Sequence, residues 1–168
     1  VGLGLGAGLV GRDAPGAGRP MTQAEFTVWH HDEQENYARG WIARGVPADQ
    51  ARAKAEADHR ALLPDGLATP GVHLEVLVSG DAVVGHVWVA RRRPDDGPGA
   101  YVYDVAVAEE HRGRGHGRSL MLLAERAALA DGLSTLALHV FTDNIPALRL
   151  YESLGYEPVE YNRAKALL

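Results

Sequence analysis

The sequence has no cysteine, no excess of basic residues and no long apolar run, and each absence excludes a class of protein. Without cysteine, a disulfide framework, a thiolate zinc site and a cysteine nucleophile are all excluded. The formal net charge of -5 argues against a general nucleic-acid binder, and the arginine run at 91–93 is expected to be a solvated strand end. No apolar stretch approaches the roughly 20 residues that a membrane helix needs.

The start of the chain also lacks the basic segment and long apolar block of a secretory signal, so we expect a cytoplasmic protein with neither a membrane nor a nucleic-acid partner. Residues 1–20 are dominated by glycine, alanine and proline and are predicted to be a flexible leader. A single domain over 21–168 should follow, since this length suits one hydrophobic core. Two alternatives stay open, a strand within Leu3–Val10 and a native start at Met21.

Two helices are predicted at the beginning of the domain. Thr22 and Glu25 form a capping box, so the first helix should cover about Gln23–Arg44. Pro47 suits the opening of a second helix over Ala48–Leu63, which the following Pro-Asp-Gly sequence ends.

The rest of the chain is predicted to form strands and two more helices. The expected strands are Val72–Val78, Ala82–Arg92, Tyr101–Val107, Leu133–Phe141 and Tyr156–Tyr161, the last near a sheet edge because it contains Pro158. The first three should form an antiparallel meander. A helix from near Gly115 to Ala130 then returns the chain for a parallel strand, so the sheet is mixed. The last helix should run from Pro146 to about Leu154.

A glycine-rich turn between the third strand and its helix is typical of phosphate binding. Its glycines let backbone N-H groups approach a ligand, the helix N-terminus adds unpaired donors, and three arginines add positive charge. A P-loop is excluded because its lysine is absent. A dinucleotide-binding turn fits no better, because Gly113, Gly115 and Gly117 alternate and follow an antiparallel meander.

Two motifs together identify a family resemblance. The first, R-x-x-G-x-G, spans Arg112–Gly117, and the second, N-x-x-A-x-x-x-Y-x-x-x-G-[FY], spans Asn144–Tyr156. With both motifs in this order, the segment Val72–Val159 resembles the GNAT superfamily of acetyl-CoA-dependent N-acetyltransferases. The resemblance implies an α/β fold of the GNAT type, with a mixed, mostly antiparallel sheet of about six strands flanked by four helices.

The resemblance also implies acetyl-CoA as the acetyl donor and assigns the residues that bind it. The pyrophosphate would lie on the turn formed by Arg112, Gly113, Arg114, Gly115, His116, Gly117 and Arg118. The pantetheine arm would run along Val105, Ala106 and Val107 like an added strand, with Asn144, Ala147 and Tyr151 as further contacts.

In this family the amine attacks the acetyl thioester directly, which requires an acid and a base. Tyr151 is the candidate acid, and the N-H of Val107 is the expected donor to the carbonyl oxygen. Asp104 is the candidate base because it is the only acidic residue within the central strand, with Tyr101 and Tyr103 expected on the opposite face. His139 is the second choice. Packing for Tyr151 and a purely structural role for Asp104 are the alternatives.

The acceptor is expected to be a small-molecule amine or a protein amine, entering between the two early helices and the central strands. The expected wall residues are Trp29, Tyr37, Trp41, His73 and Tyr103, and core packing is the alternative for Trp29, Tyr37 and Trp41. A non-catalytic acyl-CoA-binding sensor of the same fold is the competing function, and a homodimer stays open. No metal is expected, because His30 and His31 have no further ligand at a suitable spacing.

Overall fold

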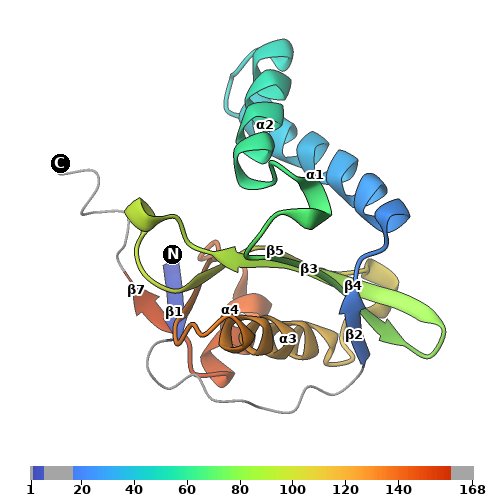
Figure 1. Ribbon diagram of the computed structural model, residues 1–168, viewed down its shortest axis with the longest axis vertical. Helices are drawn as coiled ribbons and strands as arrows, with labels where there is room; N and C mark the ends of the chain where they lie inside the picture. The colour runs from blue at the N-terminus through green and yellow to red at the C-terminus, as the bar shows by residue number, and fades with distance from the viewer. Residues whose placement is uncertain (1, 6–16, 160–168) are drawn as a thin grey trace. The chain divides into compact units, whose positions relative to one another are not determined.

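The computed structural model describes residues 2–5 and 17–159 (Figure 1). Contacts between residues divide the chain into two compact units, one formed by Met21–Val72 and the other by Val1–Pro20 together with His73–Leu168. The sequence does not predict this division, and the two units are described in turn.

The unit Met21–Val72 is a pair of helices, α1 (Gln23–Ala43) and α2 (Ala48–Leu62), followed by the short 3-10 helix Gly66–Ala68. The predicted capping box is confirmed, because Thr22 N-H donates to Glu25 Oε1 over 2.8 Å and Glu25 N-H donates to Thr22 Oγ1 over 3.2 Å.

Small residues let α1 and α2 pack closely. Ala38, Ala51 and Ala55 are buried together, and the rings of Tyr37 and Trp41 pack against them. The Tyr37 hydroxyl donates to Asp58 Oδ2 over 2.6 Å, which links the two helices. The core-packing alternative therefore describes Tyr37 and Trp41.

The other unit contains a sheet of seven strands within the described residues, in the order β2-β3-β4-β5-β6-β1-β7. The strands are β1 (Gly2–Leu5), β2 (Ala17–Pro20), β3 (Val72–Ser79), β4 (Ala82–Arg91), β5 (Ala100–Val107), β6 (Leu136–His139) and β7 (Glu157–Val159). β5 and β6 run parallel, whereas the pairs β2-β3, β4-β5, β6-β1 and β1-β7 are antiparallel. The predicted mixed, mostly antiparallel sheet is confirmed, with one strand more than expected.

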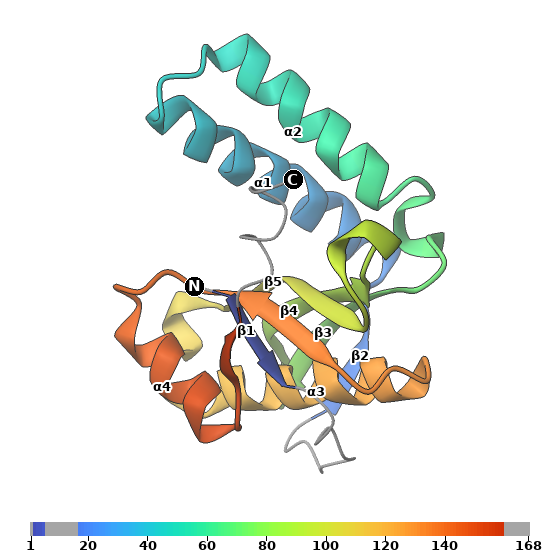
Figure 2. The same cartoon turned by 90° about the vertical axis from the view of Figure 1, so that its left-hand side faces the viewer.

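Two segments of the predicted flexible leader are strands of this sheet, so that prediction is wrong for residues 2–5 and 17–20. β1 lies between β6 and β7 (Figure 2), and Leu3 within it is only 2% exposed. The alternative of a strand within Leu3–Val10 is confirmed as far as Leu5, and residues 6–16 lie outside the described part of the chain. β2 pairs with β3, where Gly18 approaches α3 so closely that an added Cβ would lie 2.6 Å from Leu123 Cδ1.

Two helices cover the sheet in this unit. α3 (His116–Ala130) packs on β4 and β5 and buries a leucine- and alanine-rich face, and α4 (Ile145–Ser153) follows β6. Both begin within one residue of their predicted starts. The predicted strand Leu133–Phe141 is shorter than expected, since β6 covers only Leu136–His139.

Two residues of the arginine run at the end of β4, Arg91 and Arg92, contact other parts of the protein. Arg91 Nη2 donates to the carbonyl oxygen of Asp131 over 3.3 Å, and the Arg92 guanidinium lies 5.0 Å from the centre of the Tyr101 ring. Arg91 is exposed at the end of β4, as predicted, whereas the prediction of a solvated strand end is wrong for Arg92, which is partly buried against Tyr101.

Candidate active site

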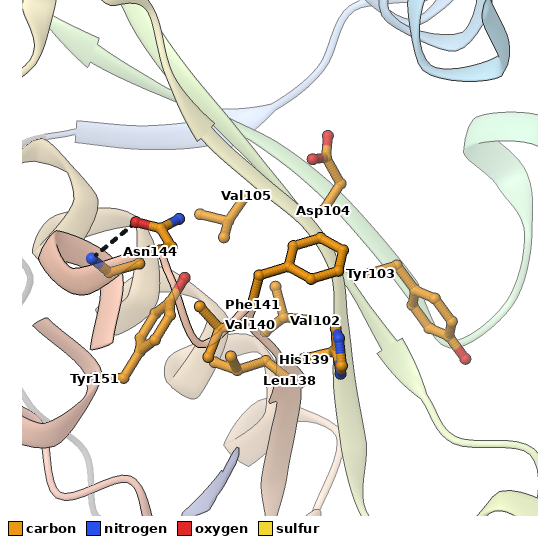
Figure 3. A pocket seen from close by; sticks show the side chains of 11 residues that line it. Val102, Tyr103, Asp104, Val105, Leu138, His139, Val140, Phe141, Asn144 and Tyr151 are labelled. Atoms are coloured by element: carbon orange, nitrogen blue, oxygen red, sulfur yellow. Dashed lines mark hydrogen bonds between the residues drawn. The ribbon is translucent and has the colours of Figure 1, made fainter. Parts of the chain in front are cut away.

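The candidate site is a pocket that opens where the parallel strands β5 and β6 separate (Figure 3). The two strands pair only through Ala100–Val102 and Leu136–Leu138. Beyond these residues the gap forms a pocket of about 210 Å³. Its lining comes from β5, from β6 with the loop after it, and from α4: Val102, Tyr103, Asp104, Val105, Leu138, His139, Val140, Phe141, Asn144, Ala147 and Tyr151.

A bulge in β5 determines which side chains face which side of the sheet. Val102 pairs with Val89 and Asp104 with Trp88, so Tyr103 is an extra residue in β5. Before the bulge Ala100 and Val102 pack in the core, and after it Val105 and Val107 do.

The bulge places Asp104 on the same face as Tyr103, so the predicted placement of Asp104 opposite the two tyrosines is wrong. The Tyr103 ring stacks on Trp88 at 4.9 Å and meets Tyr101 edge-on at 5.0 Å. On this same face Asp104 Oδ2 lies 2.5 Å from Nε2 of His86, two residues before Trp88 on β4. Simple strand alternation fails here because the extra residue reverses it.

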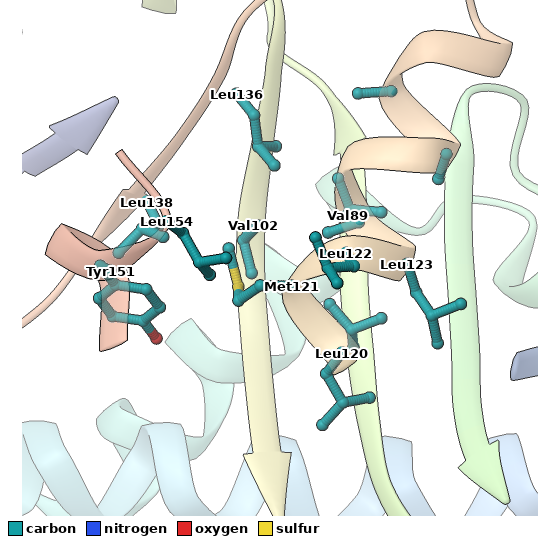
Figure 4. Close-up of a cluster of buried hydrophobic side chains, with 14 of the residues drawn as sticks. Val89, Val102, Leu120, Met121, Leu122, Leu123, Leu136, Leu138, Tyr151 and Leu154 are labelled. Carbon is teal, nitrogen blue, oxygen red and sulfur yellow. The ribbon is translucent and has the colours of Figure 1, made fainter. Parts of the chain in front are cut away.

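Tyr151 reaches the pocket from α4 and is only 7% exposed. Its ring belongs to the main core, beside Leu138, Leu154 and Met121 (Figure 4). Burial raises the pKa of the Tyr151 phenol above its usual value, because the protein interior disfavours the phenolate. The side chain therefore keeps its proton at neutral pH, which a general acid requires.

Asn144 and His139 complete the polar lining. The Asn144 side chain caps α4 by accepting from the Ala147 N-H over 3.3 Å, and Figure 3 shows its amide nitrogen pointing away from that bond. Partial burial lowers the pKa of His139, which favours the neutral imidazole. His139 also lines the same pocket as Asp104, which a candidate base must do.

The glycine turn before α3 has the geometry of an anion site. Gly113 and Gly115 have φ values of 79° and 82°, a region that favours glycine, and no atom lies within 4 Å of a Cβ added at either. The Ser119 N-H bonds to Gly115 O over 3.3 Å, so the N-H groups of 116–118 precede the first bond of the helix. These donors and the positive end of the helix dipole favour an anion at the turn.

The edge of β5 next to the turn offers backbone groups for an added strand. The Ala108 N-H bonds to Val84 O on β4 over 2.8 Å. Because successive backbone groups of a strand point to opposite edges, the Val107 N-H points away from β4. Arg112 Nε donates to Val107 O over 3.1 Å and so links the turn to this edge.

The structure thus gathers most of the predicted site residues in two adjoining places. Asp104, Val105, Asn144, Ala147 and Tyr151 share the pocket. Ala106, Val107 and the turn from Arg112 to Arg118 continue from the same end of β5. His73, an expected wall residue, instead bonds Asp131 at the end of α3, with Nε2 and Oδ2 2.8 Å apart.

Sequence reasoning missed one partner of the site, His86. The alternation of β4 could have placed His86 and Trp88 on one face, but the neighbour of His86 on β5 depends on the register and on the bulge. The described residues contain no group of three potential ligands that could hold a metal ion. Within the same residues, no helix has the length and apolar character needed to cross a membrane.

Comparison with known proteins decides the family. The sequence profile of the Acetyltransferase (GNAT) family matches residues 25–156. The chain belongs to the GNAT acetyltransferase family. The match spans most of both compact units, including every residue that lines the pocket.

Individual GNAT relatives extend over most of the chain. It is 31% identical to the uncharacterized N-acetyltransferase YycN of Bacillus subtilis over 155 residues, which make up 88% of this chain and 96% of YycN. It is also 35% identical to the mycothiol acetyltransferase of Brachybacterium faecium over 74% of this chain, but it spans only 39% of that protein.

Solved GNAT structures agree with the fold. The crystal structure of YycN from Bacillus subtilis superposes with a TM-score of 0.72 at 29% identity, covering 86% of this chain and 93% of YycN. The aminoglycoside acetyltransferase AAC(6')-Iy, solved with a CoA-containing bisubstrate analogue, superposes with a TM-score of 0.58 at 18% identity, over 86% of this chain and 92% of that one. That second likeness concerns the fold alone.

These matches confirm the predicted GNAT fold and the predicted activity. The chain is an N-acetyltransferase that transfers an acetyl group to an amine. None of these matches favours the alternative of a non-catalytic sensor.

Proposed function

We propose that the acetyl donor is acetyl-CoA, with its pyrophosphate on the turn from Arg112 to Arg118 and its arm along Val105, Ala106 and Val107. Three observations support this placement: the positive φ values and open space at Gly113 and Gly115, the unpaired first N-H groups of α3, and the edge of β5 that faces away from β4. The substrate supplies an activated acetyl thioester, and the protein supplies binding, orientation and proton transfer.

We propose Tyr151 as the general acid. Its phenol keeps its proton because burial raises its pKa, and it lines the pocket where β5 and β6 separate. In the reaction, Tyr151 gives its phenolic proton to the departing thiolate. The Val107 N-H, which points to the same edge of β5, donates a hydrogen bond to the oxygen on which negative charge develops.

We propose Asp104 as the base that takes the proton lost by the amine. Its side chain is 19% exposed and lines the pocket that Tyr151 also lines. Asp104 gains one proton from the amine, and Tyr151 loses one proton to the thiolate. Proton exchange with water then restores the Asp104 carboxylate and the Tyr151 phenol, so the protons balance over one turnover. Asn144 and Ala147, at the start of α4, are proposed as cofactor contacts beside Tyr151.

The proposed acceptor is a small-molecule amine of positive charge. The net charge of -5 would attract a cation to the protein, although it does not select one amine among many. The name of one similar protein, a mycothiol acetyltransferase, supports a small acceptor. A protein amine is the competing acceptor. Homodimer formation and a cytoplasmic location stay predictions of the sequence.

The shared pocket of Asp104 and Tyr151 is the observation on which this proposal depends. The test is release of the free CoA thiol from acetyl-CoA with a panel of polyamines, amino acids, aminoglycosides and peptides with free N-termini. We expect turnover with at least one small cationic amine, and a loss of about 10²- to 10⁴-fold in kcat for Asp104→Asn. Asp131→Asn is the matched control, because Asp131 also bonds a histidine but lies outside the pocket.

Turnover of peptides alone would contradict the small-molecule acceptor. Full activity of Asp104→Asn would contradict the assignment of the base, and His139→Gln would then be the next variant to measure. If acetyl-CoA bound tightly while no amine in the panel were acetylated, the acceptor class itself would be wrong.

A further inference from the structure

We propose that His86 is a positioning residue for acetyl transfer, which holds the Asp104 carboxylate in the orientation that accepts the proton of the amine. This inference rests on the proposed role of Asp104 as the base. His86 belongs to neither family motif described above and does not line the pocket itself.

The two side chains are held together by the geometry of the sheet. In the register of β4 and β5, His86 lies opposite Ala106 and Trp88 lies opposite Asp104, so His86 and Asp104 are diagonal neighbours. Their Nε2 and Oδ2 atoms are 2.5 Å apart, and the two side chains are 27% and 19% exposed. A contact this short between partly buried groups restricts the rotamers of both side chains.

The bulge at Tyr103 is what makes the contact available. Val87 and Val89 of β4 pack in the core, so His86 and Trp88 face the other side of the sheet. With regular alternation after Val102, Asp104 would point into the core together with Val102. The extra residue moves Asp104 onto the face of His86, so the bulge and the contact form one arrangement.

This arrangement suits the work expected of a base. An aspartate side chain rotates about two bonds, and a carboxylate that points away from the amine for much of the time is a poor proton acceptor. A bond from one of its oxygens to His86 fixes the carboxylate at the pocket.

A second histidine–aspartate pair, His73 and Asp131, lies outside the pocket and serves as the structural comparison. His73 Nε2 and Asp131 Oδ2 are 2.8 Å apart, and the two side chains are 30% and 26% exposed. This pair joins β3 to the end of α3, and neither residue lines the pocket. The two His–Asp pairs have similar side-chain exposure and similar distances, and they differ in whether they lie at the pocket. Loss of the His86–Asp104 pair should therefore lower kcat, whereas loss of the His73–Asp131 pair should lower stability.

The test is a double-variant cycle of His86→Ala and Asp104→Asn, with kcat and the KM for acetyl-CoA measured at constant pH. We expect His86→Ala to lower kcat by about 10- to 100-fold while the KM for acetyl-CoA stays within about two-fold. In the Asp104→Asn background the same change should lower kcat by less than about two-fold, because the carboxylate that it positions is gone. His86→Gln, which keeps a donor at the end of the side chain, should recover part of the loss.

Two controls separate positioning from damage to the fold. Asp131→Asn, which weakens the matched pair, should leave kcat within about two-fold and lower only the thermal stability. Thermal unfolding and acetyl-CoA binding are recorded for every variant, and if His86→Ala does not fold, the cycle is carried out with His86→Gln and His86→Asn.

Three outcomes would overturn the proposal. The first is an unchanged kcat in His86→Ala with Asp104→Asn inactive, which removes His86 but keeps Asp104 as the base. The second is an equal fold-loss from His86→Ala in both backgrounds, which assigns His86 a role unconnected with Asp104. The third is full kcat in Asp104→Asn, which removes the proposed base and, with it, the role of His86.

Discussion

Arg112 Nε donates a 3.1 Å hydrogen bond to the carbonyl oxygen of Val107, and this bond joins the glycine turn to the end of β5. One side chain therefore connects the two proposed parts of the acetyl-CoA site, which are the glycine turn for the pyrophosphate and the edge of β5 for the pantetheine arm. Arg112 also brings positive charge to the turn, so we expect it to support donor binding in two ways.

Replacing Arg112 should therefore weaken donor binding more than it slows the chemical step. For Arg112→Ala we expect a KM for acetyl-CoA raised by about 5- to 30-fold, which corresponds to about 1–2 kcal/mol, with kcat changed by less than about three-fold. Arg112→Lys keeps the charge but loses the planar donor, and it should recover part of the loss. An unchanged KM in Arg112→Ala would show that the turn does not hold the donor.

The proton of Tyr151 should remain in place over the whole working pH range. Burial raises the pKa of this phenol, so ionisation becomes important only above the usual value of about 10. We expect no decline in kcat from this group between about pH 7 and about pH 9.5. An alkaline decline in that range that is present in the wild type and absent in Tyr151→Phe would contradict the assignment.

The same shift has a consequence for stability. A folded-state pKa above the unfolded value means that the contribution of Tyr151 to stability is complete below about pH 10 and is lost as the pH rises through the folded pKa. The free energy of unfolding should therefore fall less steeply in Tyr151→Phe than in the wild type above about pH 10. Urea titrations of the two proteins on each side of that pH provide the measurement.

Leu3 should contribute to stability like a core residue, although it lies within a glycine-rich segment. It is 2% exposed and packs with the main core from β1. Leu3→Ala should lower the free energy of unfolding by about 2–4 kcal/mol, whereas Val83→Ala, at a position 41% exposed, should change it by less than about 0.5 kcal/mol. Equal urea midpoints for Leu3→Ala and the wild type would mean that β1 is not a strand of the sheet in solution.

Two glycine substitutions should have opposite effects. A Cβ added at Gly85 would lie 2.6 Å from Ala106 O and 2.8 Å from Leu120 Cδ1, so Gly85→Ala must push β5 or α3 away and should cost about 1–3 kcal/mol. Gly40 lies inside α1, and nothing lies within 4 Å of its added Cβ. Gly40→Ala should therefore raise the free energy of unfolding by up to about 1 kcal/mol. Thermal and urea unfolding check both, and the prediction fails if Gly85→Ala is as stable as the wild type.

Local patterns in the sequence predict those parts of the fold that short-range chemistry determines. The capping box at Thr22 fixed the start of α1, Gly115 fixed the start of α3, and Pro146 indicated the first turn of α4. The family resemblance followed from the motifs around the glycine turn and Tyr151. These features need only neighbours within a few residues, so one sequence is enough to find them.

Long-range register explains what the sequence did not reveal. β1 has glycine at alternate positions and therefore lacks the composition of a strand, but its backbone bonds to β6 and β7. The bulge at Tyr103 turns the Asp104 side chain to the opposite face of the sheet, and no local sequence signal marks the bulge. His86 becomes a partner of Asp104 only once both the register and the bulge are known.

The most direct test of the active-site assignment is the kcat of Tyr151→Phe beside that of Tyr156→Phe. Both substitutions remove the hydroxyl of a buried tyrosine, and the two rings lie 6.0 Å apart, but of these two residues only Tyr151 lines the pocket. With acetyl-CoA and an amine that the wild type acetylates, we expect Tyr151→Phe to lose about 10²- to 10⁴-fold in kcat with binding of acetyl-CoA retained, and Tyr156→Phe to stay within about three-fold. A Tyr151→Phe enzyme with wild-type kcat would contradict the account.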